Sequence, residues 1–234
     1  MKTRLTGMIV GVLVASTAMA QGYQVQEVYK FANGAQAQNA TALKNFGHSG
    51  EVVGSQFLFN TWVKGVIVNN EGVEFTNGLF NYDKISQNLY INTNENNQAF
   101  LVFKKDVKSV TLTDGVTTVT LEKVPALKTD QLYTVLAKGS RYTLYALTKT
   151  KFVPASFSTN GISSSGNMYD EYRDEKSYFI VSASGAAQPV SLKMKSVKAA
   201  LQADKEKVED YLKQNPDATI DENFVSLLVQ SLNL

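Results

Sequence analysis

The chain has 234 residues, 44% of them hydrophobic, with no cysteine and a single histidine, His48. These counts exclude a disulfide framework, an acylated-cysteine lipid anchor, thiol catalysis and any multi-histidine metal site. Lysine and arginine number 23 and aspartate and glutamate 21, so the chain lacks the basic excess with which proteins bind nucleic acid.

The first 20 residues have the pattern of a secretory signal peptide. Lys2 and Arg4 form a positive start, residues 5–14 are an apolar run too short for a comfortable membrane span, and Ala18-Met19-Ala20 is a cleavage signal. We expect export and cleavage after Ala20, which gives a soluble periplasmic or extracellular protein. Removing Lys2 and Arg4 from the 23 basic residues leaves 21, the same as the number of acidic residues.

Three segments are expected after the signal peptide. Residues 21–50, rich in glutamine, asparagine, alanine and glycine, form an N-terminal arm that covers the domain or stays mobile. Residues 51–194 form a β domain, and residues 195–234 form helices that pack on its sheet. The predicted fold class is therefore α+β and mostly β. It is an antiparallel meander sheet, arranged as a sandwich or an open barrel-like structure, with two to three C-terminal helices.

Short apolar runs separated by turn-forming residues occupy residues 54–103, as is typical of antiparallel strands with one buried face. Phe57 and Phe59 are expected on one face of the first strand. Turns are predicted at residues 70–72, at Asp114-Gly115 and at residues 138–140, where residues that tolerate tight turns separate apolar runs. The polar residues 158–176 are predicted to form a loop or a long hairpin tip.

Helical spacing begins near residue 196. Ser196 is expected to cap a first helix, Asp204 to interrupt it and cap a second segment, and Asp221 to cap the last helix. The apolar stripe of the last helix comprises Phe224, Leu227, Leu228 and Leu232. We expect this stripe to cover the sheet and close the core that Phe57, Trp62 and Tyr82 begin. The alternative is a helix that binds a partner.

Short motifs in the first β region resemble those of a group of small secreted proteins of Bacteroidota. The motifs are Gly54-Ser55-x-Phe57-Leu58, Trp62-x-x-Gly65, Leu79-x-x-Tyr82-Asp83 and Leu89-x-Ile91. They cover about a fifth of the chain and are structural in kind. The resemblance implies an exported, β-rich protein from such a bacterium, and it carries no activity or functional residues that could be transferred.

The candidate ligand-binding residues are aromatic or acidic: Trp62, Tyr82, Asp83, Tyr169, Asp170, Tyr172 and Asp174. A glycosidase needs only two carboxylates at a set distance, and tyrosine rings beside the acidic run 170–175 suit a sugar. The ordinary alternatives are a core or rim position for Trp62 and a turn position for Asp83. The acidic run would then be a solvated loop whose charges Arg173 and Lys176 offset.

Other chemistry finds little support in the sequence. His48 lies in a glycine-flanked loop without a G-x-S-x-G motif, and no phosphate-binding glycine loop is present. Asn92, Asn94 and Asn96 alternate as calcium ligands might, but the run lacks aspartate and a glycine hinge. We therefore predict no catalytic residue, no metal and no cofactor.

Two functions follow from these observations. The first is a non-catalytic envelope or secreted protein, a binding or structural module whose partner is an envelope protein or a glycan. The second is a hydrolase that acts on envelope glycans through a carboxylate pair. A pocket in which the acids of residues 170–175 face Asp83 would favour the hydrolase, and a convex solvated loop would favour the binding module. The oligomeric state is left open.

Overall fold

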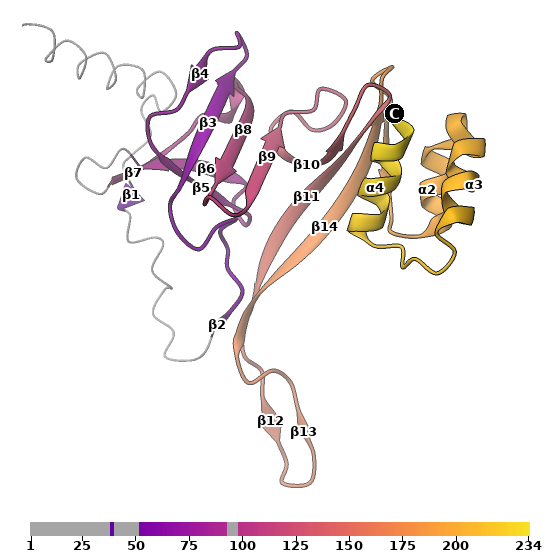
Figure 1. Ribbon diagram of the computed structural model, residues 1–234. Helices are drawn as coiled ribbons and strands as arrows, with labels where there is room; N and C mark the ends of the chain where they lie inside the picture. The colour runs from indigo at the N-terminus through magenta and orange to yellow at the C-terminus, as the bar shows by residue number, and fades with distance from the viewer. Residues whose placement is uncertain (1–37, 40–51, 93–97) are drawn as a thin grey trace, which may run out of the picture.

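The computed structural model describes residues 38–39, 52–92 and 98–234 (Figure 1). The predicted signal peptide, nearly all of the N-terminal arm and His48 lie outside the described residues, as does most of the asparagine-rich run after Asn92.

The strands form one 13-stranded sheet and one small two-stranded sheet within the described residues. They are β1 (Gln38–Asn39), β2 (Val52–Val53), β3 (Val63–Asn69), β4 (Glu74–Phe75), β5 (Leu79–Asp83), β6 (Asn88–Asn92), β7 (Gln98–Leu101), β8 (Val107–Thr113), β9 (Thr118–Glu122), β10 (Tyr133–Lys138), β11 (Tyr142–Val153), β12 (Ser158–Thr159), β13 (Ser164–Ser165), β14 (Asp170–Ser182) and β15 (Ala187–Val190). The helices are η2 (Lys104–Asp106), α2 (Met194–Ala200), η3 (Gln202–Asp204), α3 (Lys205–Gln214) and α4 (Glu222–Leu232).

The large sheet curls into a half-barrel with the order β1-β7-β6-β5-β3-β8-β9-β10-β11-β14-β15. Its strand pairs are antiparallel, except that β2 pairs with β14 in parallel. The three α-helices gather beside the β10–β15 end of the sheet (Figure 1). A mostly β α+β fold with C-terminal helices is thus confirmed, and of the two predicted arrangements the open, barrel-like one is found.

The first core lies inside the curl formed by β3 to β9. Alternation places Val63 and Ile67 inward on β3 while Lys64 points outward, and Leu112 of β8 joins them. Gly65 lets the sheet curl tightly here, because a Cβ at that position would come within 2.7 Å of Leu112 and 2.9 Å of the Phe80 ring.

A second, separate core lies between the helices and the β10–β15 end of the sheet. Val225, Leu228 and Val229 of α4 are fully buried in it, together with Leu144 of β11 and Ile180 of β14. The last helix therefore packs on the sheet as expected. The prediction that it closes the core containing Tyr82 is wrong, because Tyr82 belongs to the first core and the two clusters are distinct.

The side chain of Asn233 fastens the end of α4 to the β10–β11 turn. Its Oδ1 accepts hydrogen bonds from the backbone nitrogens of Arg141 and Tyr142 at 2.8 and 3.0 Å. Its Nδ2 donates to the carbonyl oxygens of Tyr142 and Val229 at 3.0 and 2.8 Å. Gly139 leaves room for this side chain, since a Cβ there would overlap it.

The predicted turns at residues 70–72, 114–115 and 138–140 are confirmed, and Gly72 and Gly115 both have a positive φ. The predicted strand through Phe57 and Phe59 is wrong. Phe57 makes only an isolated bridge, to Asp83, and the chain before Val63 is irregular. The buried Asn81 side chain provides the reason, because it bonds the nitrogen and carbonyl of Phe59 in place of a strand ladder.

Three details of the helices also differ from expectation. Asp204 precedes α3, but its carboxylate accepts hydrogen bonds from Arg141 and Tyr142 instead of capping the helix. Helix α2 begins at Met194 after Lys193, and the Ser196 hydroxyl accepts a hydrogen bond from the nitrogen of Ser191 instead of capping the helix. Leu227 lies on the outside of α4 with 46% of its surface exposed, and Val225 and Val229 take its place in the buried stripe. The Asp221 cap is confirmed, because its side chain accepts from the nitrogen of Phe224 at 2.8 Å.

Candidate functional site

A long hairpin stands out from the body of the protein (Figure 1). Strands β11 and β14 pair continuously from Tyr142 opposite Ser182 to Val153 opposite Glu171. Beyond them β12 and β13 form a small sheet that no other described strand joins. We call residues 152–172 the finger and residues 154–169 its tip. Of the two predictions for residues 158–176, the long hairpin tip is found, and a loop is wrong over residues 170–176, which form part of β14. Charged residues can occupy this strand because both of its faces reach solvent, as in the cross-strand pair of Lys151 and Glu175 at 2.7 Å.

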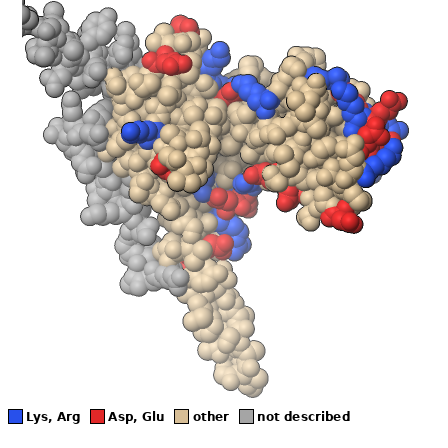
Figure 2. All heavy atoms as spheres, viewed as in Figure 1, with Lys and Arg blue, Asp and Glu red and all other residues tan. Residues whose placement is uncertain are grey.

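The finger tip carries no charge and much exposed apolar surface. Residues 152–169 contain no lysine, arginine, aspartate, glutamate or histidine. In Figure 2 this part of the molecule shows neither blue nor red spheres, while both colours gather at its base. The exposed apolar side chains of residues 152–169 are Ile162 (97% exposed), Met168 (76%), Phe157 (47%), Phe152 (38%) and Tyr169 (38%). The remaining tip residues are mostly serine, threonine, asparagine and glycine.

Local hydrogen bonds define the shape of the tip. Oδ1 of Asn160 accepts from the nitrogens of Ile162 and Ser163 at 3.0 and 2.8 Å, and Gly161 follows with φ +84°. This is the side-chain-supported turn that asparagine followed by glycine favours. Gly166 has φ +86° and lies so close to the backbone of Ser156 that a Cβ would overlap it. The tip therefore has a definite shape that presents Ile162 at its end.

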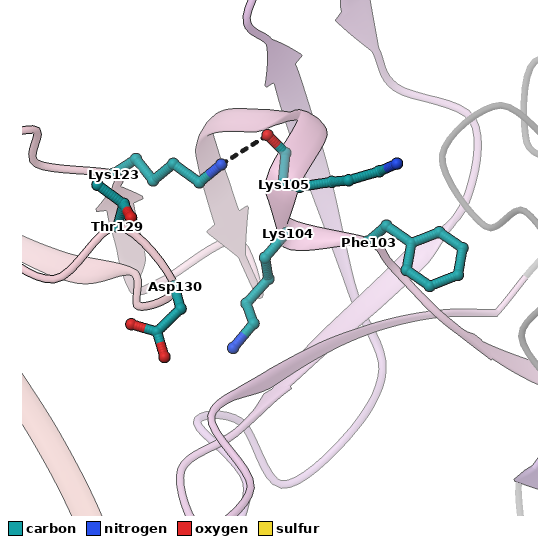
Figure 3. Close-up of a pocket in the computed structure, with 6 residues that line it drawn as sticks. All are labelled: Phe103, Lys104, Lys105, Lys123, Thr129 and Asp130. Carbon is teal, nitrogen blue, oxygen red and sulfur yellow. Dashed lines mark hydrogen bonds between the residues drawn. The ribbon is translucent and has the colours of Figure 1, made fainter.

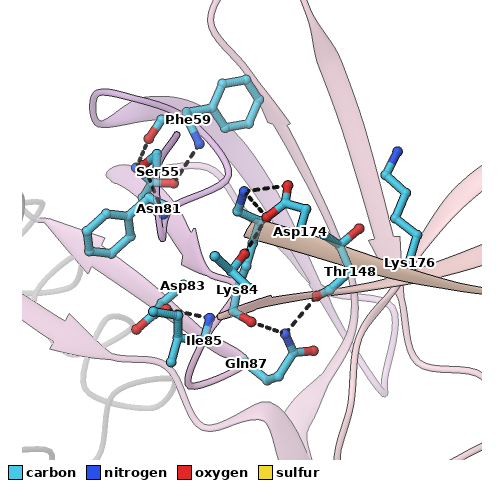
Figure 4. A network of polar contacts seen from close by, with 12 residues as sticks. Ser55, Phe59, Asn81, Asp83, Lys84, Ile85, Gln87, Thr148, Asp174 and Lys176 are labelled. Carbon is cyan, nitrogen blue, oxygen red and sulfur yellow. Dashed lines mark hydrogen bonds and ion pairs between the residues drawn. The ribbon is translucent and has the colours of Figure 1, made fainter. Parts of the chain in front are cut away.

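A polar network fastens the base of the finger to the first half of the sheet (Figure 4). Lys84, in the turn after β5, lies within 2.9 and 2.8 Å of the two carboxylate oxygens of Asp174 on β14. The hydroxyl of Thr150 donates to the same carboxylate at 2.5 Å. Gln87 of the same turn donates to the Thr148 carbonyl of β11 at 2.9 Å. Lys84 is only 8% exposed, so this ion pair is better shielded from water than a surface pair.

Packing and pairing support the base from a second direction. β2 pairs with residues 170–171 of β14, and Gly54, with φ +83°, passes so close that a Cβ would lie 2.6 Å from the Tyr172 carbonyl. The rings of Phe152 and Tyr172 lie 5.2 Å apart. Asp170 is buried, and its Oδ1 accepts from the nitrogen of Ala155 at 2.7 Å. The finger is thus held in one orientation up to about residue 155.

Several of the predicted ligand-binding residues meet at this base. The pKa of Tyr172 is raised by burial first, and then by the charges of two of the predicted acids, Asp83 and Asp170. Asp174 joins the network described above, and Tyr169 is exposed on the finger. Trp62, by contrast, is a half-buried residue just before β3.

Tyr82 and Asp83 have structural partners at the end of β5. Tyr82 is 3% exposed, its hydroxyl donates to Oε1 of Gln87 at 3.2 Å, and burial raises its pKa well above the usual value. Oδ1 of Asp83 accepts from the nitrogens of Ile85 and Ser86 at 2.8 and 3.3 Å, and Oδ2 accepts from the Ser86 hydroxyl at 2.7 Å. Asp83 is thus a turn residue, one of the two interpretations of the sequence.

The acidic run 170–175 is also engaged in local contacts. Glu171 pairs with Arg173 at 2.6 Å, and Asp174 and Glu175 are paired with lysines. Within the part of the chain that the structure describes, no cluster of three or more potential metal ligands occurs. Likewise, no helix among the described residues is long and apolar enough to cross a membrane.

Comparisons with protein-family models, with curated proteins and with solved structures give no match. The functional argument therefore depends on the geometry of this molecule. Its most prominent feature, the finger, corresponds to the long hairpin tip that was one of the two predictions for residues 158–176. The sequence reasoning missed its projection from the body and the roles of Ile162, Met168 and Lys84. One signal was available, since residues 152–169 are uncharged while a charged run follows them at residues 170–176.

Proposed function

We propose that this protein is a non-catalytic, exported recognition module of the cell envelope or its surroundings, and that it binds a partner protein through the finger tip. The observation that carries this proposal is the projection of an uncharged tip with exposed apolar side chains from a well-anchored base. Export is supported by the signal-peptide pattern of the first 20 residues.

The chemistry of the tip suits a protein surface. The centres of protein interfaces are depleted of charge and enriched in aromatic residues and methionine. Among the described residues, five of the eleven large hydrophobic side chains that are exposed lie between residues 152 and 169. The serines, asparagines and glycines between them can form adaptable hydrogen bonds, as they do in antibody loops. A partner of matching chemistry would offer an uncharged, apolar groove that accepts Ile162 and Met168.

The anchored base would make binding efficient. A loop that must be ordered on binding costs free energy, and a segment already held in its bound shape avoids most of that cost. The ion pair of Lys84 with Asp174 and the close packing of Gly54 on Tyr172 hold the finger base before any partner arrives. The finger can therefore act as a preformed recognition element.

The alternative is a glycan-acting hydrolase that uses a carboxylate pair near Tyr172. The observation in favour of this alternative is that the charges of Asp83 and Asp170 both raise the pKa of Tyr172. The hydrolase is less well supported, because both carboxylates of a glycosidase must be free to reach the substrate. One protonates the glycosidic oxygen, and the other activates a water molecule or attacks the sugar carbon. Both oxygens of Asp83 already bind its own turn, and Asp170 is buried with a backbone partner. The geometry therefore favours binding over hydrolysis.

Site-specific photocrosslinking can test the proposal in the native envelope. One variant carries a photoreactive amino acid in place of Ile162. The control variant carries the same photoreactive amino acid in place of Val116, on the β8–β9 turn. The two positions are matched, because their side chains are 97% and 95% exposed. We expect the Ile162 probe to form one dominant protein adduct that the Val116 probe does not form.

Charge substitutions provide the second arm. Ile162→Asp should abolish binding of the adducted protein in purified form, and Val116→Asp should leave it unchanged, while both variants keep the thermal midpoint of the parent. Equal adducts from both probes, or equal binding by both variants, would contradict the proposal. Hydrolysis of envelope glycans that is lost in Asp83→Asn would favour the alternative.

A further inference from the structure

A second polar feature lies where η2 meets the loop between β9 and β10. An open hollow of about 610 Å³ is lined there by Phe103, Lys104, Lys105, Lys123, Thr129 and Asp130. Figure 3 shows Lys104, Lys123 and Asp130 on one side of η2, with Lys105 extending beside the Phe103 ring on the other. Three of the six lining residues are thus cations, and one is an anion.

Within the part of the chain that the structure describes, the lysines of the hollow form no ion pair. No carboxylate of the described chain forms an ion pair with Lys104, Lys105 or Lys123. The Lys104 ammonium donates to the carbonyl of Gln87 at 2.6 Å, and the Lys123 ammonium donates to the carbonyl of Lys105 at 2.7 Å. An ammonium group has three N–H donors, so each of these two keeps donors for another partner.

Burial makes this lack of partners costly for the charged forms. It lowers the pKa of Lys104 and of Lys123, and the charges of Asp130 and Asp106 oppose that shift only in part. Lys123 and Lys105 add to the positive charge around Lys104. A bound anion would supply the missing counter-charge and would favour both ammonium forms.

We propose that this hollow binds a doubly charged oxyanion, a phosphate or sulfate group, through the ammonium groups of Lys104 and Lys123 on its lining. Lysine binds such groups as a point charge, and two lysines offer donors to separate oxygens. A double charge is specified because Asp130 faces the same space and offsets part of the attraction for a single charge. The open hollow leaves room for an organic molecule that carries the group. This site is independent of the finger.

Calorimetric titration of the purified protein with inorganic phosphate, at constant ionic strength and near neutral pH, tests the proposal. Lys104→Gln and Lys123→Gln should each weaken binding about tenfold, because each removes one charged donor. Lys195→Gln, at an exposed position of α2, is the matched control and should bind as the parent does. Asp130→Asn should tighten binding, and because this side chain is exposed the substitution leaves the fold intact.

A second ligand distinguishes the source of the anion. Phenyl phosphate that binds more tightly than inorganic phosphate assigns the group to an organic ligand, and equal binding assigns it to the free ion. Either result supports the site when Lys104→Gln weakens binding. Three outcomes overturn the proposal: no heat of binding above the chloride control, equal binding by Lys104→Gln and Lys195→Gln, or weaker binding by Asp130→Asn.

Discussion

Leu228→Ala should be among the most destabilising single changes in this protein. Leu228 lies on α4, has no exposed surface and belongs to the core between the helices and the sheet. Truncation to alanine removes three carbon groups, worth roughly 0.8 kcal/mol each on transfer from water. The cavity left behind adds a further cost, so the free energy of unfolding should fall by about 2–5 kcal/mol.

The neighbouring residue supplies a matched control. Leu227 has the same side chain on the same helix, but 46% of its surface is exposed. Leu227→Ala should therefore change the free energy of unfolding by less than about 1 kcal/mol. Urea titration followed by circular dichroism measures both variants, and the Leu228→Ala midpoint should shift several times further. If the two variants lose equal stability, α4 does not pack through Leu228, and the partner-binding interpretation of its stripe becomes the better one.

Three further predictions concern other contacts. Asn233→Ala should lower the free energy of unfolding by about 1–3 kcal/mol, because it leaves backbone groups of Tyr142 without partners. Gly139→Ala should cost a similar amount but add little to Asn233→Ala in a double-mutant cycle, and full additivity would contradict the clamp. Lys84→Met should speed amide hydrogen exchange in the outer part of β11 and β14. Lys151→Met, which removes an exposed ion pair in the same hairpin, should not. Equal exchange in both variants would show that the base network does not anchor the finger. Alkali should also unfold the protein, since burial raises the pKa of Tyr142 to about 12 and unfolded tyrosine ionises near 10.0. The contribution of Tyr142 to the free energy of unfolding is complete below pH 10 and is lost as the pH rises through 12. Tyr142→Phe should therefore flatten the decline of the urea midpoint with pH. An unchanged decline would refute the assignment to Tyr142.

Contacts between residues close in the chain were accessible from the sequence. The turn at Asp114-Gly115 and the cap at Asp221 depend on side chains that bond backbone groups two or three positions away. Alternation and helical spacing similarly predicted a β domain followed by helices. The uncharged run 152–169 was also visible, although composition alone does not say that it projects.

Contacts between distant residues required the tertiary structure. The candidate acids could be named from the sequence, but their use in turns and ion pairs depends on which strands meet. Lys84 and Asp174 are 90 positions apart, and only the approach of the β5–β6 turn to the long hairpin makes them a pair. The same holds for Leu227 and Leu228, because helical spacing defines a stripe only to within about one residue and the position of the sheet decides which leucine is covered.

The sequence by itself determined the near-neutral charge, the absence of thiol chemistry, the β-rich fold class and the main turns, because these depend on composition and on neighbouring residues. Only the tertiary structure decided that α4 completes a second core, that residues 152–172 form a free-standing finger, and that Lys104 and Lys123 share one hollow. These features follow from strand order and sheet curvature. Both are set by the combined burial of side chains distant in the chain, which local patterns do not encode.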